Sequence, residues 1–223
     1  MNAQELRLDY FNIYDVVDYR VDYQVALQGQ FDEEPKKAEL LSLSNFANPV
    51  SKNKEPIYNP HAHLTWYALY QPIPEPTRIV VVENQFGQQK IVIGMPRAFA
   101  APAQKRQKGS QFPEDLDHFK LYWVLEGEPV SKVVALQDQF GIEEMGETKV
   151  SWPLALGVPV KKEYRGEVSP IHNEEAHLMI YRITPRSLKQ GRGVRDQFDG
   201  RDLTFRLSVL LAAPSVKLRW EEW

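Results

Sequence analysis

Hydrophobic and polar residues alternate with a period of two along short stretches of the chain, which is the pattern of a β-strand with one buried face. In the stretch 118–125, Phe119 and Leu121 fall on one face, while His118 and Tyr122 fall on the other. The same alternation occurs in the stretches 8–14, 61–67 and 175–181. Each stretch is therefore predicted to form a strand whose apolar face lies in a core.

Two further patterns follow each of these strands at similar distances. A Gln-Phe pair lies at a predicted turn, at 30–31, 85–86, 139–140 and 197–198. Each closing stretch ends in Pro-x-x-Lys, at Lys52, Lys105, Lys162 and Lys217. Columns that recur at a period of about 55 residues indicate internal duplication. The sequence thus predicts four tandem repeats, the units 8–52, 61–105, 116–162 and 175–217.

Strand-forming residues also dominate the middle and closing segments, as at 79–82, 133–136 and 203–207. Three to four short strands per repeat predict an all-β protein of β-sandwich or barrel-like bodies. A four-bladed propeller would match the number of units. However, Pro96 and Pro153 make the closing segments irregular and predict an interrupted or bulged strand there. One short helical turn is predicted within 35–43.

Polar linkers that contain Pro or Gly separate the units. The linker that begins at Arg106 is the predicted boundary between two domains, 1–107 with repeats one and two and 108–223 with repeats three and four. The other linkers have similar lengths. A single body of four repeats is therefore the alternative.

Composition narrows the function classes. With 223 residues, 43% of them hydrophobic, the chain can bury one large core or two smaller ones. A net charge of -3 gives no overall attraction for nucleic acid or anionic membranes. Cysteine is absent, which excludes disulfides and thiolate chemistry. No apolar run suits a secretory signal or membrane span, so we expect a cytoplasmic location, with a leader removed earlier as the alternative.

At the repeated columns the chain resembles an uncharacterised bacterial family of domains of unknown function, found as tandem units and often in exported proteins. Its units read His-Phe-x-Cys-Tyr, Asp-Gln-Phe-Gly and Cys-x-Pro-x-x-Lys, as around His118 and at 138–141 here. The resemblance covers nearly the full length and implies no known activity.

Each pair of cysteine columns in that resemblance holds one large apolar residue and one small residue here. The pairs are Ile13 with Ala47, Trp66 with Ala100, Leu121 with Gly157 and Ile180 with Ala212. If relatives join the two columns by a disulfide, the resemblance implies that the columns are in contact. Packing of a large residue against a small one would fill the same space here.

Three of the five histidines share one repeat column, in which the first unit carries Tyr10. Imidazoles two residues apart on a strand, as His61 and His63 would be, point to one face and could bind a metal. No acidic residue recurs with them. Packing on a sheet face is the favoured interpretation, and neither a metal nor a cofactor is predicted.

In each unit, the column residue and the tyrosine four positions later share a strand face. Such an aromatic stripe suits packing between repeats or a surface that meets a partner. Two tryptophans near the C-terminus could cover an open edge of their own sheet or dock on another subunit. The candidate interaction residues are Tyr10, Tyr14, His63, Tyr67, His118, Tyr122, His177, Tyr181, Trp220 and Trp223.

The remaining motifs favour no catalysis. Asp138 and Asp196 precede a Gln-Phe pair, where short polar side chains usually bond nearby backbone rather than act as a glycosidase pair. Basic clusters at 105–108 and 186–195 are expected to be solvated loops, and nucleic acid is not a predicted partner. No phosphate loop, dinucleotide fingerprint or hydrolase motif occurs, so no enzymatic activity is predicted.

These observations predict a non-enzymatic structural or assembly protein that acts through protein–protein contacts, with itself as a homo-oligomer or with another protein. The alternative is a module that binds carbohydrate or another ligand through aromatic sheet faces. That face would lie around Trp66, Tyr70, Trp123 and Trp152.

Overall fold

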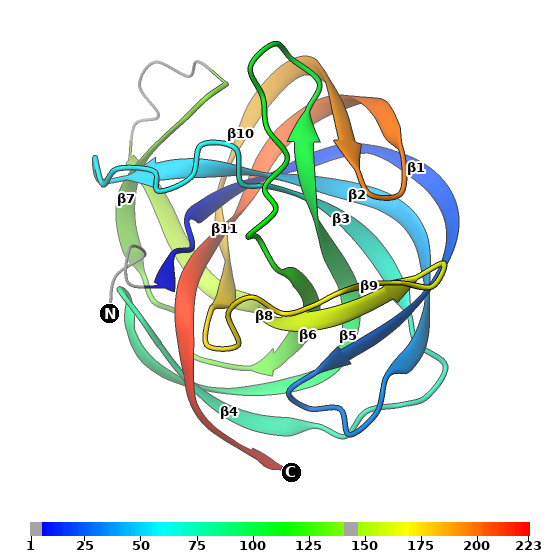
Figure 1. Ribbon diagram of the computed structural model, residues 1–223. Coiled ribbons are helices and arrows are strands. Elements are labelled where there is room, and N and C mark those ends of the chain that lie inside the picture. Colours follow the sequence, from blue (N-terminus) through cyan, green and yellow to red (C-terminus); the bar gives the residue numbers. More distant parts are fainter. Residues whose placement is uncertain (1–5, 141–146) are drawn as a thin grey trace.

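Strand-forming stretches become strands along almost the whole chain. The computed structural model describes residues 6–140 and 147–223, without the side chain of Lys189. Its strands all pair antiparallel in a single sheet (Figure 1), which confirms the all-β prediction. They are β1 (Tyr10–Gly29), β2 (Lys36–Lys52), β3 (His63–Tyr70), β4 (Arg78–Asn84), β5 (Gly87–Lys105), β6 (His118–Glu126), β7 (Lys132–Asp138), β8 (Glu147–Tyr164), β9 (Glu167–Ser169), β10 (His177–Asp196) and β11 (Gly200–Glu222).

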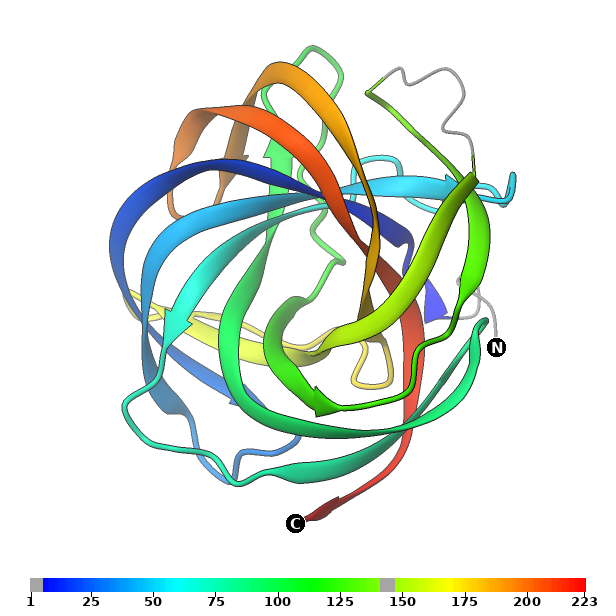
Figure 2. The same cartoon turned by 180° about the vertical axis from the view of Figure 1, so that it is seen from behind.

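Part of the sheet closes into a ring. The ring order is β1, β2, β3, β5, β6, β8, β10 and β11, and β11 pairs with β1 again. The view from behind shows these strands curving around a common interior (Figure 2). The predicted boundary near residue 108 lies in the loop between β5 and β6. Strands from both sides of it pair directly, at β5–β6 and at β1–β11.

The interior of the ring is an apolar core in which large residues face small ones. Each large residue of the first cysteine column lies directly opposite the small residue of the second. The observed pairs are Ile13 with Ala47, Trp66 with Ala100, Leu121 with Gly157 and Ile180 with Ala212. All of these except Gly157 belong to one buried cluster. The predicted contact between the columns is confirmed.

Most ring strands continue beyond the ring as bent hairpins. Pro96 and Pro153 lie where the pairing register shifts, within the uninterrupted strands β5 and β8. The predicted bulges are therefore confirmed, whereas the predicted interruptions are wrong. Proline has no N–H for the ladder, but at a bulge that position need not be paired, so the strand continues.

The predicted helical turn at 35–43 is also wrong, since residues 36–43 belong to β2. Gly141, in the third predicted turn, lies outside the described residues.

The far end of each hairpin pairs with a closing strand elsewhere in the ring. There, each lysine of the Pro-x-x-Lys columns lies opposite an apolar residue of the hairpin. The pairs are Lys52 with Leu136, Lys105 with Val194, Lys162 with Leu27 and Lys217 with Val82. Two further apolar clusters form on the outer face of the ring, beneath the hairpins. This outer face holds the eight predicted interaction residues of the tyrosine and histidine columns, all of which are buried.

Candidate functional site

The tyrosine column is buried and holds turns that are distant in sequence. Tyr14 Oη donates to Asp138 Oδ2 at 2.5 Å, and Tyr67 Oη donates to Asp196 Oδ2. Each aspartate accepts the backbone N–H of the phenylalanine two residues later on its other oxygen. The predicted bonding of these aspartates to nearby backbone is confirmed. In addition, each carboxylate joins two remote parts of the chain.

Electrostatics fix the direction of these hydrogen bonds. Burial, reinforced by the charge of the neighbouring aspartate, raises the pKa of Tyr14 and of Tyr67. Both phenols therefore stay protonated and act as donors. The rings of this column also meet the turn phenylalanines edge-on at centroid distances from 5.1 to 5.4 Å. The pairs are Tyr14 with Phe140, Tyr67 with Phe198, Tyr122 with Phe31 and Tyr181 with Phe86.

At the first turn, Gly29 occupies the position that Asp138 and Asp196 hold in the third and fourth turns, so no tyrosine–aspartate bond forms there. A buried ionic cluster takes its place. Lys120 Nζ lies 2.7 Å from Asp32 Oδ2 and 2.9 Å from Glu75 Oε1. Arg78 Nη1 lies 3.1 Å from Glu75 Oε2, to which Tyr122 also donates. The cluster links three segments of the chain beneath the outer hairpins.

The charge state of Glu75 follows from two opposing effects. Burial raises the pKa of Glu75, but the charge and hydrogen bond of Lys120, with help from Gln71 and Lys36, outweigh it and lower the pKa to about 2. Glu75 is therefore an ion-pair partner rather than a proton donor near neutral pH. This geometry supports a structural role.

The lysine and glutamine columns contact one another. Lys105 Nζ donates to Gln139 Oε1 at 2.9 Å and lies 4.5 Å from the centroid of the Phe140 ring. Equivalent hydrogen bonds join Lys162 to Gln197 and Lys217 to Gln30. The fourth lysine and glutamine, Lys52 and Gln85, do not bond to each other directly but both donate to Glu55. These motif columns thus hold the hairpin turns against the ring.

The histidine column is buried and neutral. Burial is the main cause that lowers the pKa of His118 to about 3 and of His177 to about 4, and it also lowers the pKa of His63. His61 lies in the turn before β3, so the strand-face pair with His63 considered for metal binding does not form. Within residues 6–140 and 147–223, no group of three or more His, Cys, Asp or Glu residues could hold a metal ion.

The structure separates the predicted interaction residues into two sets. The eight residues of the tyrosine and histidine columns are buried in contacts within the chain and do not form an exposed surface. Trp220 and Trp223 are 39% and 68% exposed. They lie at the end of β11, where Trp220 pairs with Val80 and Trp223 N–H donates to Thr77 O at 2.9 Å. The C-terminus therefore covers β4 of its own chain, one of the two predicted arrangements.

The opposite edge of this terminal segment pairs with no other strand among the described residues. In the described part of the chain, the stretch 216–222 pairs with β4 alone, because β10 and β1 pair with β11 only before it. Figure 1 shows β11 running past the ring to the C-terminus. The corresponding end of β8, in contrast, is covered by β9, which pairs with 162–164. An open edge with large apolar side chains is a site for strand pairing with another chain.

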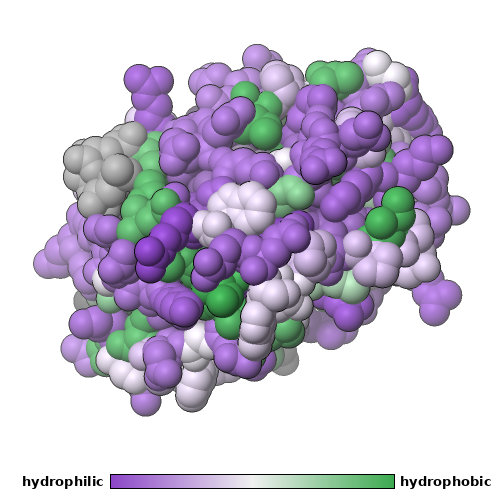
Figure 3. Space-filling model, turned by 90° about the horizontal axis from the view of Figure 1, so that it is seen from below, coloured by the Kyte–Doolittle hydropathy of each residue, from purple (hydrophilic) through white to green (hydrophobic). Residues whose placement is uncertain are grey.

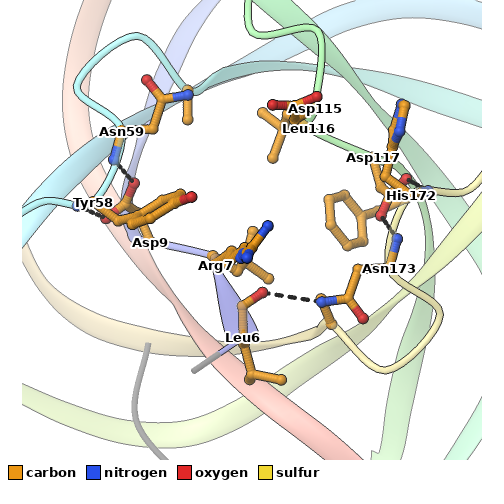
Figure 4. A pocket seen from close by; sticks show the side chains of 14 residues that line it. Leu6, Arg7, Asp9, Tyr58, Asn59, Asp115, Leu116, Asp117, His172 and Asn173 are labelled. Carbon is orange, nitrogen blue, oxygen red and sulfur yellow. Dashed lines mark hydrogen bonds between the residues drawn. The ribbon is translucent and has the colours of Figure 1, made fainter. Parts of the chain in front are cut away.

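A cavity of about 660 Å³ opens at one end of the ring, where the opening strands begin (Figure 4). Asp9 accepts the backbone N–H groups of Tyr58 and Asn59, and Asp117 accepts those of His172 and Asn173. Burial, partly offset by these bonds, raises the pKa of both aspartates. The two carboxylates thus bind the linkers to the ring and lie on opposite sides of the opening (Figure 4).

The cavity combines apolar walls with the side chain of Arg7. Leu8, Leu116 and Phe119 contribute apolar surface from the ring core. Arg7 is exposed at the rim and has a positive φ of 52°, a conformation that non-glycine residues rarely adopt. Asp115 lines the same opening. The arrangement could hold a small molecule with an apolar body and a polar head.

The other sequence candidates do not converge on a surface. Trp66 is buried inside the ring and Trp123 is partly buried against the same core, so they share no exposed face with Tyr70 and Trp152. The basic cluster 186–195 lies within β10, and its expected loop is therefore wrong. On the face shown in Figure 3, hydrophobic residues occur in separate patches between hydrophilic ones.

Comparison with known proteins identifies a family but no activity. A family model described as a repeat of unknown function (DUF7450) matches residues 63–214. Neither the curated proteins nor the solved structures include a match to the chain. In the part of the chain that the structure describes, no helix is long and apolar enough to cross a membrane.

Proposed function

The chain belongs to this family of repeats of unknown function (DUF7450), and we propose that it is a non-enzymatic assembly protein that self-associates through the free edge of β11. The open edge at 216–222 is the observation that carries this proposal. Its four predicted repeats provide a rigid closed body. The terminal strand extends from that body as the contact element.

The sequence of the edge is complementary to itself. Arg219 and Glu221 flank Trp220 on its two sides, so an antiparallel copy centred on Trp220 places a base opposite an acid. With Trp220 at the two-fold axis, Arg219 of each copy lies opposite Glu221 of the other. Aromatic and opposite-charge cross-strand pairs each stabilise a sheet by about 0.2–1 kcal/mol. A two-fold dimer contains the Arg219–Glu221 pair twice and the Trp220–Trp220 pair, which lies on the axis, once.

Local contacts prepare Trp220 for this role. Its ring packs edge-on against Phe31 at 5.0 Å, while Arg78 lies 5.8 Å from its centroid. A tryptophan that is already ordered loses less side-chain entropy on association. Because the segment 216–222 is held by β4, its free N–H and C=O groups are also aligned before a second copy binds.

Light scattering over a range of concentrations tests the proposal. The unaltered chain is expected to form dimers at high concentration. Arg219→Glu places an acid opposite Glu221 at both symmetry-related positions of the dimer. The repulsion should raise the dissociation constant at least several-fold. The combined exchange Arg219→Glu with Glu221→Arg restores both pairs and should restore the dimer. A monomer at all concentrations, or dimers indifferent to these changes, would refute the proposal.

A second candidate function is ligand binding in the cavity at the end of the ring. The exposed Arg7 beside apolar walls supports it. An anionic amphiphile would place its head on Arg7, which offers bidentate hydrogen bonds to a carboxylate. Calorimetric titration with decanoate should show binding that Arg7→Ala weakens about tenfold. Equal binding of decanoate by both proteins would reject this cavity as the anion site.

A further inference from the structure

One lysine of the Pro-x-x-Lys columns has an unusual neighbour. Lys105 is 2% exposed and Asn48 is 0% exposed. Lys105 Nζ lies 2.7 Å from Asn48 Oδ1. Within the described residues, Asn48 Nδ2 has no hydrogen-bond partner. Among the described residues, the Asn48 side chain is therefore hydrogen-bonded through its oxygen to Lys105, and no hydrogen bond holds its nitrogen in place.

The equivalent positions of the other predicted repeats lack this amide. Asn48 immediately precedes the proline of its closing motif. The residues that precede the proline in the other motifs are Ala101, Val158 and Ala213. A buried amine and a buried amide therefore meet only once among the four columns. Repetition of the fold does not require this contact, so it calls for a separate explanation.

Burial makes the neutral form of the Lys105 amine more accessible than that of an exposed lysine, and the charge of Asp138 acts on the amine. Burial lowers the pKa of Lys105 to about 8, while the charge of Asp138 acts in the opposite direction and that of Arg192 in the same one. At pH 7 about one tenth of such an amine is neutral. Asp138 is itself held by Asn12 and Tyr14. Asn12 lies opposite Asn48 in the β1–β2 ladder.

We propose that Lys105 and Asn48 form an intramolecular isopeptide bond after folding, with Asp138 as the group that transfers protons. A desolvated lysine next to an acceptor is the usual arrangement for an amine nucleophile. Holding both reactants in contact converts the step to a unimolecular one and greatly raises its rate.

The reaction needs no oxidant or cofactor. Asp138 accepts a proton from the Lys105 ammonium, and the neutral Nζ attacks Cγ of Asn48, forming the new N–C bond while the carbonyl electron pair moves to Oδ1. The attacking nitrogen then passes a proton through Asp138 to Nδ2. When the carbonyl reforms, the Cγ–Nδ2 bond breaks. The products are a secondary amide and ammonia, which leaves as ammonium with the proton first taken from Lys105.

The bond would join the closing strands β2 and β5 across the outer face of β3, which lies between them. A cross-link closes a long loop in the unfolded chain and thereby raises stability, as a disulfide does, so the melting temperature should be about 10 °C higher with the bond than without it. This gain would be independent of the redox compartment.

Mass spectrometry of the denatured full-length chain tests the proposal. The mass of the main species should be lower than the sequence mass by one molecule of ammonia. A tryptic digest should contain one branched peptide that joins the segments around Asn48 and Lys105. Because residue 49 is proline and has no backbone N–H, ring closure of Asn48 onto the following nitrogen cannot produce the same loss.

Matched variants locate the chemistry. Lys105→Arg keeps the charge and should show the full sequence mass, whereas Lys162→Arg, in the same column but with Val158 in place of the asparagine before its proline, should still lose ammonia. Asp138→Asn should retain the full mass if the aspartate carries the proton. The proposal is overturned if the unaltered chain has its full sequence mass or if Lys105→Arg still loses ammonia.

Discussion

The inside of the ring and its outer face are both buried, yet they are built from different chemistry. Inside, Ile13, Trp66 and Leu121 each face an alanine or glycine, and shape alone decides the fit. Outside, Tyr14 and Tyr67 bond to aspartates located 124 and 129 residues away. The inner core supplies non-directional burial, whereas the outer contacts specify which hairpin turn meets which strand.

The outer face also differs from the interior in its sensitivity to charge. An apolar core tolerates neither voids nor excess volume, but it does not respond to pH. A buried polar network loses stability when one partner is removed, because the remaining group stays desolvated. Substitutions on the outer face should therefore cost more stability than substitutions in the ring core. The expected loss in the free energy of unfolding is largest in the ionic cluster and smallest in the ring core.

The largest effect is expected for Glu75→Ala. This change leaves Lys120 and Arg78 buried without the acid that both contact, and breaking a buried ion pair costs about 3–5 kcal/mol. The matched control is Lys36→Ala, since Lys36 is the partly exposed partner and should cost less than about 1 kcal/mol. Urea unfolding of both variants measures the difference. Equal losses for the two would show that the cluster is not stabilising as a buried unit.

Acidification should reduce stability through the buried histidines. His118 and His177 have lower pKa values in the folded chain, about 3 and about 4, than the ordinary value of 6.5. The unfolded chain therefore binds protons first, so stability is complete above about pH 6.5 and falls as the pH decreases toward 4. Because each unit of pKa shift corresponds to about 1.4 kcal/mol, each of the two histidines should contribute a loss of about 3 kcal/mol by pH 4.

The chain supplies its own control for this pH dependence. Tyr10 occupies the same column in the first predicted repeat and does not ionise in this range. His177→Tyr should therefore flatten the dependence of the unfolding free energy on pH between 6.5 and 4. An unchanged slope would show that other groups cause the loss.

The sequence predicted the strands, because alternation and repetition are local patterns. The contact between the cysteine columns was implied by the resemblance to a family whose units carry cysteines there. The sequence also predicted that Asp138 bonds nearby backbone. It could not predict that the same carboxylate meets Tyr14, since that contact depends on how the hairpins fold back over the ring. The pairing of Lys105 with Asn48 was missed for the same reason. Its only sequence signal was a polar residue at a column that is apolar in the other repeats.

The ring core should show the smallest effect, through Gly157→Ala. An added Cβ would lie 3.0 Å from Leu121 Cδ2 and 3.2 Å from Leu178 Cβ, so these neighbours must shift. Overpacking and the lower flexibility of alanine in the unfolded chain act in opposite directions, and the net loss should be about 1 kcal/mol. Gly191→Ala is the control, since its nearest neighbour would be 3.7 Å away. If thermal unfolding shows Gly157→Ala to be as harmless as Gly191→Ala, the ring interior is looser than the outer face, and shape complementarity does not explain why a small residue lies opposite Leu121.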